Sequence, residues 1–335
     1  MTNKKKLLNR VLVGFAIFVV IIGIILLNIY FPNYISGEET FFSGRAITSV
    51  IFYLLILLSV IEMRRALGKD KIPDSFSWIL WVYGFGAGPS YSLFGYTGII
   101  FFSLLVFISA VVTALFKNRV DILIYIGFML VYPGLLMAAL LYLNRSAAAN
   151  IDVTRPELQQ YLEYDIWTFL SNSRGSYLLP LNAISLAFVF AVSTLTDTFA
   201  FFVGSLFGKH KLSPEISPNK SVEGAIGGIV GGMLGSALVY IFFDMPNFQP
   251  FGAQFGLTFV GLGLANYQIA LTYVIIAVLG SLATQIGDLL ASLVKRYCGN
   301  KDYSRILGEH GGIMDRFDGI MLNAVLVSFV FMFIL

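Results

Sequence analysis

Long apolar runs dominate this sequence, and they constrain its fold more than any other feature. A helix needs about 20 mostly apolar residues to cross the roughly 30 Å hydrocarbon core of a bilayer. Nine segments meet this requirement, near 11–37, 46–63, 76–95, 97–116, 122–143, 179–203, 222–243, 268–294 and 317–335. The sequence therefore predicts an all-α, polytopic integral membrane protein with about nine transmembrane helices.

Two of these assignments depend on local signals. The stretch 76–116 is divided in two because it contains Gly86, Gly88, Pro89, Gly95 and Gly98, which break apolar helices. The run 11–37 is interpreted as a spanning helix. A cleaved signal peptide is the alternative, but its apolar region is usually about 7–15 residues long and ends at a small-residue cleavage site, which this run lacks.

The scarcity of charge limits the classes of protein to which the chain can belong. Of its 335 residues 12% are charged and 57% are hydrophobic, and the mean hydropathy is +0.81. This composition excludes a soluble enzyme, a disordered chain and a nucleic-acid-binding module. The single cysteine, Cys298, excludes an intramolecular disulfide and a four-cysteine metal site, so a bound metal would need mainly oxygen ligands.

The distribution of lysine and arginine predicts the orientation in the membrane. With the N-terminus in the cytoplasm, all but four of the 22 basic residues fall on the cytoplasmic side, the exceptions being Arg45, Arg145, Arg155 and Arg174. The loops 204–221 and 295–316 are then cytoplasmic. The segment 144–178 is then external, and its helical apolar period suits either an interfacial helix or an ordinary amphipathic connector.

Ionisable residues within the predicted spans point to the second half of the chain. A carboxylate in a spanning helix costs about 2.5–3.5 kcal/mol, so it normally faces a polar cavity or a cation. Asp197, Asp288, Asp315 and Asp318 all lie within or at the ends of apolar helices after residue 180. We therefore divide the chain into N-terminal transmembrane helices of unclear role, 1–120, and a functional membrane-embedded region, 121–335.

The aspartates fall into helical patterns with other polar residues. Gln285, Asp288, Ser292 and Lys295 form one stripe of a helix that leads toward the cytoplasm. Asp315 and Asp318 would share one face of the last helix. A divalent metal ion is a better partner for the two carboxylates than Arg316. The alternative interpretation is that both are solvated acidic residues in the first turn of the helix, where the helix dipole favours them. Asp197 shares a helix face with Thr194 and Thr198. Its position is compatible with three roles: a ligand, a substrate contact or a hydrogen-bonded residue in helix packing.

Two predicted cytoplasmic loops combine basic residues with glycine or proline. The loop 204–221 contains Lys209, Lys211 and Lys220, which is compatible with binding of a polyphosphate. The positive-inside rule alone also explains the positive charge of this loop. The loop after Lys295 contains Lys301, Asp302, Arg305 and His310, and we expect His310 to contact phosphate or form a loop hydrogen bond rather than act as a general base. Glycines 224, 228 and 232, and 227, 231 and 235, form two rows that predict close helix packing.

These residues together fit a long pattern, S-x-x-K-R-x4-K-D-x4-L-[PG]-x-H-G-G-x-x-D-R-x-D, which runs from Ser292 through Arg296 to Asp318. The pattern resembles the signature of the phosphatidate cytidylyltransferase (CDP-diacylglycerol synthase) family. A second stretch, GKHKLSPEISPNKSVEGAIGG, is also similar to this family, and the resemblance is strongest over 180–335. Family members often read D-S-G-A-Y at Asp197, whereas this chain has phenylalanine at 199 and 201.

The resemblance implies transfer of a cytidylyl group from CTP to phosphatidic acid at a membrane-embedded cytidylyltransferase region, with Mg²⁺ as cofactor and a second cation left open. Asp288, Asp315 and Asp318 would hold the metal and act with Lys295 in catalysis. Substrate contacts are expected from the remaining set, Lys209, Lys211, Lys220, Ser292, Arg296, Lys301, Asp302, Arg305, His310, Arg316 and Asp197.

The expected partners are therefore CTP, phosphatidic acid and the bilayer, with no nucleic acid and with a homodimer left open. We expect a multi-pass plasma-membrane protein whose active site faces the cytoplasm. A CTP-dependent transferase that acts on another lipid phosphate, such as a prenyl-ether phosphate, would need the same residues. A cation-coupled transporter would explain intramembrane aspartates but not the spaced charges of two cytoplasmic loops.

Overall fold

The computed structural model describes residues 19–28, 34–35, 38–39, 44–145, 181–245, 266–308 and 311–334. Most of the predicted first span, nearly all of the segment 144–178, and His310 lie outside the described residues. The chain divides into two compact units, which we describe separately. Unit 1 comprises 1–20, 49–142 and 286–325, and unit 2 comprises 21–48, 143–285 and 326–335.

The described part of the chain is almost entirely helical, as the apolar pattern predicts. Besides a short helix at Val19–Asn28, its helices are α2 (Gly44–Lys71), α3 (Asp74–Lys117), α4 (Ile122–Met129), η1 (Leu130–Leu135), α5 (Leu136–Arg145), α8 (Leu181–Phe207), α9 (Val222–Phe243), α12 (Asn266–Tyr297) and α13 (Met314–Ile334). Six helical stretches are long and apolar enough to cross a membrane, at 46–71, 74–117, 122–144, 182–207, 222–243 and 267–297. The chain is therefore a multi-pass membrane protein.

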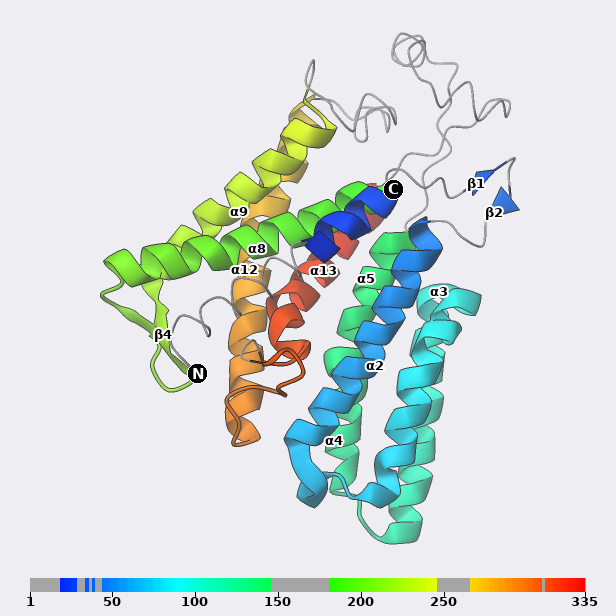
Figure 1. The fold of residues 1–335 in the computed structure, drawn as a ribbon. Coiled ribbons are helices and arrows are strands. Elements are labelled where there is room, and N and C mark those ends of the chain that lie inside the picture. Colours follow the sequence, from blue (N-terminus) through cyan, green and yellow to red (C-terminus); the bar gives the residue numbers. More distant parts are fainter. Residues whose placement is uncertain are drawn as a thin grey trace. The chain divides into compact units, whose positions relative to one another are not determined.

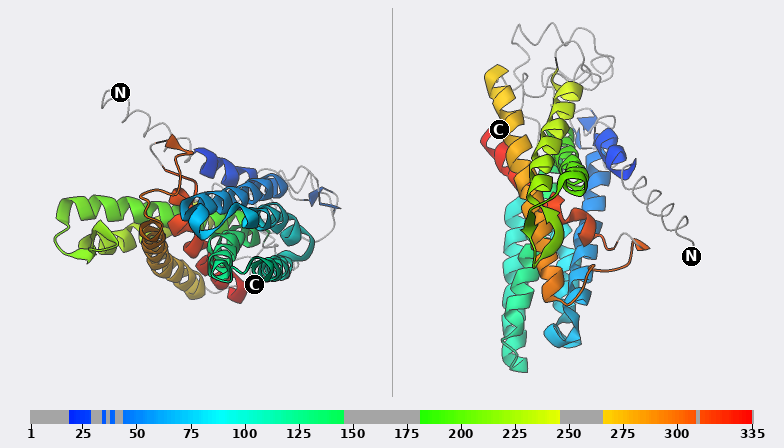
Figure 2. Two further views of the ribbon diagram at one scale, coloured as in Figure 1. Left: turned by 90° about the horizontal axis from the view of Figure 1, so that it is seen from below. Right: turned by 90° about the vertical axis from the view of Figure 1, so that its left-hand side faces the viewer.

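In unit 1, α2, α3 and the continuous α4–η1–α5 segment run alongside one another (Figure 1), and the view from below shows them nearly end-on (Figure 2). Helix α3 folds back on itself at Gly95, where φ is +64°. As a result the Tyr83 ring stacks on Phe102, and Ser103 donates a hydrogen bond to the Tyr83 hydroxyl at 3.4 Å. The two arms 74–94 and 96–117 confirm the predicted division of this apolar stretch.

In unit 2, the glycine rows of α9 allow the close helix packing that the sequence predicts. A Cβ at Gly231 would lie 2.3 Å from the Leu195 carbonyl oxygen of α8, and one at Gly235 would lie 2.7 Å from the Ala191 carbonyl oxygen. Gly232 instead faces α12, where the Ser281 hydroxyl would be only 1.8 Å from an added Cβ. Glycine thus lets α9 approach both neighbours.

The loop between α8 and α9 forms a β-hairpin, which the sequence analysis did not predict. Strand β3 (Lys211–Ser213) pairs antiparallel with β4 (Ser217–Ser221), and this hairpin lies where α8 ends and α9 begins (Figure 1). The Ser221 hydroxyl accepts a hydrogen bond from the Gly224 N–H at 3.1 Å and so caps α9. A second short antiparallel pair joins β1 (Tyr34–Ile35) to β2 (Glu38–Glu39).

Candidate active site

The predicted catalytic residues of unit 1 meet where α12 ends and α13 begins. The Lys295 ammonium lies 2.7 Å from Asp315 Oδ1 and 3.9 Å from Asp318 Oδ2. The side chains of Lys295, Asp315 and Asp318 are only 13%, 4% and 12% exposed, so water screens these charges weakly. The shared helix face predicted for the two aspartates is confirmed. The cation between them in this structure is Lys295.

Asp315 also fixes the loop that precedes α13. Its Oδ2 atom accepts hydrogen bonds from the backbone N–H groups of Tyr303, at 2.9 Å, and Gly312, at 2.8 Å. Gly311 has φ of +79°, and an added Cβ there would lie 2.7 Å from Asp315 Oδ2. The glycine is therefore required both by its backbone conformation and by the close carboxylate. Asp315 thus holds Lys295 and two points of the loop, Tyr303 and Gly312, in one network.

Glu62 of α2 holds the same loop from the other side, and the sequence analysis missed it. This carboxylate is fully buried and accepts hydrogen bonds from the Ser304 hydroxyl, at 2.6 Å, and from the N–H groups of Ile313 and Met314, at 2.9 and 2.8 Å. It thereby supplies acceptors for two N–H groups at the start of α13. An added Cβ at Gly312 would lie 2.6 Å from both Glu62 carboxylate oxygens.

The signal for Glu62 was present in the sequence. It is an ionisable residue within the apolar run 46–63, and such residues deserve the same functional interpretation as the later aspartates. Glu62 stands apart from the other ionisable residues of the predicted spans, which all lie after residue 180. Further contacts of α2 with the same region come from Asn300, which donates to the Ala66 carbonyl at 3.1 Å, and from Lys71, which donates to the Tyr297 carbonyl at 3.1 Å.

Two buried tyrosines lie beneath this network. The Tyr303 hydroxyl donates to the Ala291 carbonyl of α12 at 3.2 Å and lies 3.4 Å from the Tyr132 hydroxyl of η1. Burial raises the pKa of the Tyr303 phenol well above its ordinary value, so this group stays neutral at working pH. Tyr132 lies within electrostatic range of the three predicted catalytic carboxylates, those at 288, 315 and 318.

Close approach of α12 and α13 places Asp288 beside this group. An added Cβ at Gly287 would lie 2.6 Å from the Asp318 carbonyl oxygen, so only glycine permits this crossing. Asp288 follows Gly287 directly and is half-buried. The three aspartates and Lys295 thus come from two helices that glycine holds together.

The donor chemistry of this group suits a hard cation such as Mg²⁺, because its ligands would be carboxylate oxygens. Within the residues that the structure describes, however, no three acidic, histidine or cysteine side chains are grouped closely enough to hold a metal ion. Both oxygens of Asp315 already accept hydrogen bonds, one of them from the Lys295 ammonium. A metal ion bound to Asp315 would therefore have to compete with these donors.

The other predicted residues of unit 1 lie on α12, on the loop that follows it and at the start of α13. Ser292 of α12 is half-buried, whereas the charged side chains around it are exposed, namely Arg296, Lys301, Asp302, Arg305 and Arg316. Their exposure is compatible with contact to a soluble substrate.

Predicted residues of unit 2 gather on the hairpin. Glu223, at the start of α9, accepts hydrogen bonds from the backbone N–H groups of Lys209, at 3.0 Å, and His210, at 3.2 Å, and its carboxylate lies 2.6 Å from His210 Nδ1. This contact fixes the backbone while the side chains of Lys209 and Lys211 are exposed and that of Lys220 is half-buried.

The remaining polar residues of unit 2 divide between surface and packing. Asp197 is exposed on α8. Gln285, the first residue of the predicted polar stripe, donates to the Ala225 carbonyl of α9 at 3.1 Å. Buried hydroxyl pairs also join α8 to α12, between Ser193 and Thr284 at 3.1 Å and between Thr196 and Ser281 at 3.0 Å. Gln285 therefore contributes to helix packing.

Several curated proteins are similar to this chain in sequence. Curated relatives include phosphatidate cytidylyltransferases of Staphylococcus saprophyticus, 39% identical over 147 residues, and Staphylococcus epidermidis, 40% identical over 146 residues. Each of these matches covers 42% of this chain and 48% of the relative. The enzyme of the same name from Brucella abortus is 37% identical over 148 residues, which cover 44% of this chain and 47% of the relative.

The chain thus spans about half the length of the curated relatives that it matches. The family comparison extends further, because residues 9–334 match the cytidylyltransferase family, and this range includes both Glu62 and the Lys295–Asp315 network. On this evidence the chain belongs to the cytidylyltransferase family.

Proposed function

We propose that this protein transfers a cytidylyl group from CTP to phosphatidic acid and releases pyrophosphate, with CDP-diacylglycerol as the lipid product. The names of the partial relatives support this acceptor. The observation that carries the proposal is the buried Lys295 ammonium, which two aspartates hold beside a loop with exposed basic side chains. Such a site places one lysine held by carboxylates, and exposed cations beside it, at the boundary between apolar helices and an aqueous loop.

The proposed reaction needs electrostatic relief more than it needs a base. An oxygen of the lipid phosphate attacks the α-phosphorus of CTP, and the bond between that phosphorus and the bridging oxygen to the β-phosphate breaks. A phosphate monoester carries close to two negative charges at pH 7, so the attacking oxygen is already ionised. Repulsion between the two phosphates is the main obstacle, and it is relieved by positioned cations.

We assign this relief to residues of the network and its loop. Lys295 would orient toward the reacting phosphates, while Arg316 and the neighbouring basic side chains would stabilise the departing pyrophosphate. We further propose Mg²⁺ as the cofactor. Asp288, Asp315 and Asp318 would hold it only after moving closer together than they lie in this structure, and when bound it would neutralise phosphate charge. Asp315 also has a positioning role that does not require the metal, because it holds the loop.

We place this chemistry on the cytoplasmic face of the plasma membrane, from the asymmetric distribution of lysine and arginine. In this arrangement CTP would approach from the cytoplasm and the acyl chains of the acceptor would stay within the bilayer. The contacts of Lys209, Lys211 and Lys220 with the triphosphate are part of the same proposal.

The proposal is tested with purified protein in detergent, given phosphatidic acid and each of the four nucleoside triphosphates, with Mg²⁺ or EDTA. Pyrophosphate release should require CTP, phosphatidic acid and the divalent cation together. A parallel reaction with a prenyl-ether phosphate tests the acceptor. Preference for that lipid would refute phosphatidic acid as the substrate, and failure with every phosphorylated lipid would refute the transferase activity.

A further inference from the structure

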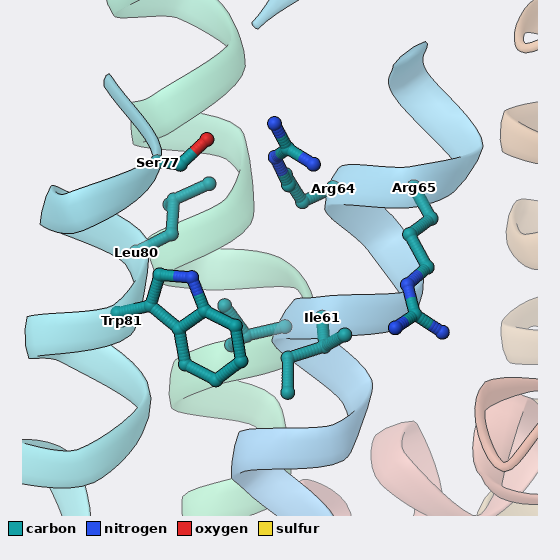
Figure 3. Close-up of a pocket in the computed structure, with 7 residues that line it drawn as sticks. Ile61, Arg64, Arg65, Ser77, Leu80 and Trp81 are labelled. Atoms are coloured by element: carbon teal, nitrogen blue, oxygen red, sulfur yellow. The ribbon is translucent and has the colours of Figure 1, made fainter. Parts of the chain in front are cut away.

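A small polar pocket lies between α2 and the first arm of α3, in unit 1. Its volume is about 110 Å³, and its polar lining comes from Arg64, Arg65, Ser77 and Trp81 (Figure 3). Arg64 follows Glu62 by two positions on α2, which is about 200° around a helix. Arg64 therefore lies on the opposite face of α2 from the Glu62 carboxylate, whereas Arg65, three positions after Glu62, lies nearer to it.

Two of the polar atoms in this pocket lack partners. Arg64 Nε and Ser77 Oγ are both buried and have no hydrogen-bond partner among the residues that the structure describes. Buried polar groups are normally satisfied, so each such atom needs an explanation. The other end of the Arg64 guanidinium pairs with Asp74, which restrains the side chain. Both unpartnered atoms are covered in this structure, so a ligand with acceptor oxygens would satisfy them once these two side chains turn toward the pocket.

The charges around the pocket favour an anion. The Asp74 carboxylate forms ion pairs with both Arg64 and Lys69, and the Lys69 ammonium lies 2.7 Å from it. These three side chains therefore carry a net charge of one positive unit. Arg65 also lines the pocket, is exposed, and makes no ion pair with another described residue. Trp81 lies on the α3 side, with the nitrogen edge of its indole turned toward Arg64 in Figure 3. The guanidinium groups of Arg64 and Arg65 and the indole N–H of Trp81 are hydrogen-bond donors, which suits phosphate oxygens.

The setting of the pocket favours a lipid as the source of the phosphate. Apolar residues Val60, Ile61 and Leu80 complete its lining, and Trp78, Trp81 and Val82 expose 46–47% of their surface on the adjacent arm of α3. Exposed tryptophans on spanning helices are typical of the headgroup level of a bilayer, and basic pockets between helices bind anionic headgroups. Acyl chains could lie along this apolar surface while the phosphate reaches Arg64.

We propose that this pocket binds the phosphate group of an anionic phospholipid at the predicted cytoplasmic surface. The proposal does not depend on the acceptor used in catalysis, since it concerns binding at Arg64, on the opposite face of α2 from Glu62. It differs from the substrate contacts proposed above, none of which involves Arg64, Ser77 or Trp81.

Tryptophan quenching by brominated lipids tests the proposal with the full-length protein. The chain has three tryptophans, so Trp78→Phe and Trp167→Phe leave Trp81 as the only fluorophore. This variant is reconstituted in phosphatidylcholine vesicles that contain increasing fractions of brominated phosphatidylglycerol, phosphatidic acid or phosphatidylcholine. We expect the anionic lipids to quench Trp81 with an apparent association constant about tenfold higher than that of phosphatidylcholine.

Variants of the pocket should remove this preference. In the same background, Arg64→Gln and Ser77→Ala should bring the anionic and zwitterionic curves together, whereas Arg119→Gln serves as a matched control. Arg119 is an exposed arginine of the same unit that pairs with Asp121 at 2.9 Å, far along the chain from the pocket. Ser77→Ala is nearly isosteric, so it keeps the test decisive if Arg64→Gln aggregates on size-exclusion chromatography.

Inorganic phosphate distinguishes the two sources of the anion. Millimolar phosphate added to plain phosphatidylcholine vesicles should leave Trp81 fluorescence unchanged and should not compete with brominated anionic lipid. Competition by free phosphate would overturn the assignment to a lipid. An anionic preference that persists unchanged in Arg64→Gln and Ser77→Ala would overturn the site itself, because general attraction to the basic surface would then explain the binding.

Discussion

Removal of the Glu62 carboxylate should disable the catalytic loop although Glu62 itself belongs to the N-terminal helices. In the Glu62→Ala variant, the N–H groups of Ile313 and Met314 and the Ser304 hydroxyl lose acceptors at 2.9, 2.8 and 2.6 Å. A buried group left without its partner costs about 1–3 kcal/mol. The hydroxyl can rotate, so the two N–H groups set the scale, and we expect a loss of about 2–6 kcal/mol in the stability of the loop conformation.

This loss should appear mainly in kcat. The loop carries the Tyr303 and Gly312 N–H groups that fix Asp315, and Asp315 in turn holds Lys295. We expect kcat to fall about 100-fold in Glu62→Ala, with the KM for phosphatidic acid changed by less than about threefold. Glu62→Gln keeps one acceptor oxygen and should be milder. Asp70→Ala, an exposed acid on the same helix, is the matched control and should be neutral.

A double-mutant cycle separates this mechanism from general destabilisation. A Cβ at residue 312 would lie 2.6 Å from both Glu62 carboxylate oxygens, so Gly312→Ala should lower kcat in the wild-type background. In the Glu62→Ala background the clash is gone, and the same change should cost much less. Purified Glu62→Ala protein with kcat within about twofold of wild type, or strictly additive effects of the two changes, would refute the reasoning.

Two further predictions concern the substrate contacts and the topology. Lys220→Gln and Arg316→Gln should raise the KM for CTP or lower kcat more than they alter the dependence of the rate on phosphatidic acid. Steady-state kinetics in which each substrate is varied in turn will check this. An unchanged dependence on CTP in both variants would exclude both residues from the site. In a Cys298→Ser background, cysteines introduced at the exposed positions Glu215 and Ile306 should react with a membrane-impermeant reagent only after the cells are opened. Labelling of these cysteines in intact cells would show that the protein has the opposite orientation in the membrane.

Apolar length and glycine placement made most of the described fold predictable. The run 46–63 became α2, the break within 76–116 occurs at Gly95, and the glycines of α9 pack against neighbouring helices. These features depend on local composition, which the sequence displays directly. The β-hairpin at 211–221 was less accessible, because prolines in a loop exclude a helix without specifying the pairing that replaces it.

The candidate site was predictable only in part. Helical spacing placed Asp315 and Asp318 on one face, and the structure confirms this. The partner of a buried carboxylate is a tertiary contact, however, and spacing along one helix could not identify Lys295 as the cation between them. For the same reason the 251 positions that separate Glu62 from Ile313 hid their contact. The N-terminal helices had no predicted role, yet Glu62 of α2 holds the loop between α12 and α13.

We propose that the aspartates around Lys295 support cytidylyl transfer to a lipid. The most direct test of this proposal is the transfer of label from CTP labelled at the α-phosphate into the lipid fraction by purified wild-type, Asp288→Asn, Asp315→Asn and Asp318→Asn proteins. We predict CTP-dependent labelling of phosphatidic acid by wild type, a loss of several orders of magnitude at 288 and 315, and a milder loss at 318. Near-wild-type labelling by the Asp288 and Asp315 variants, with an unshifted Mg²⁺ requirement, would contradict it.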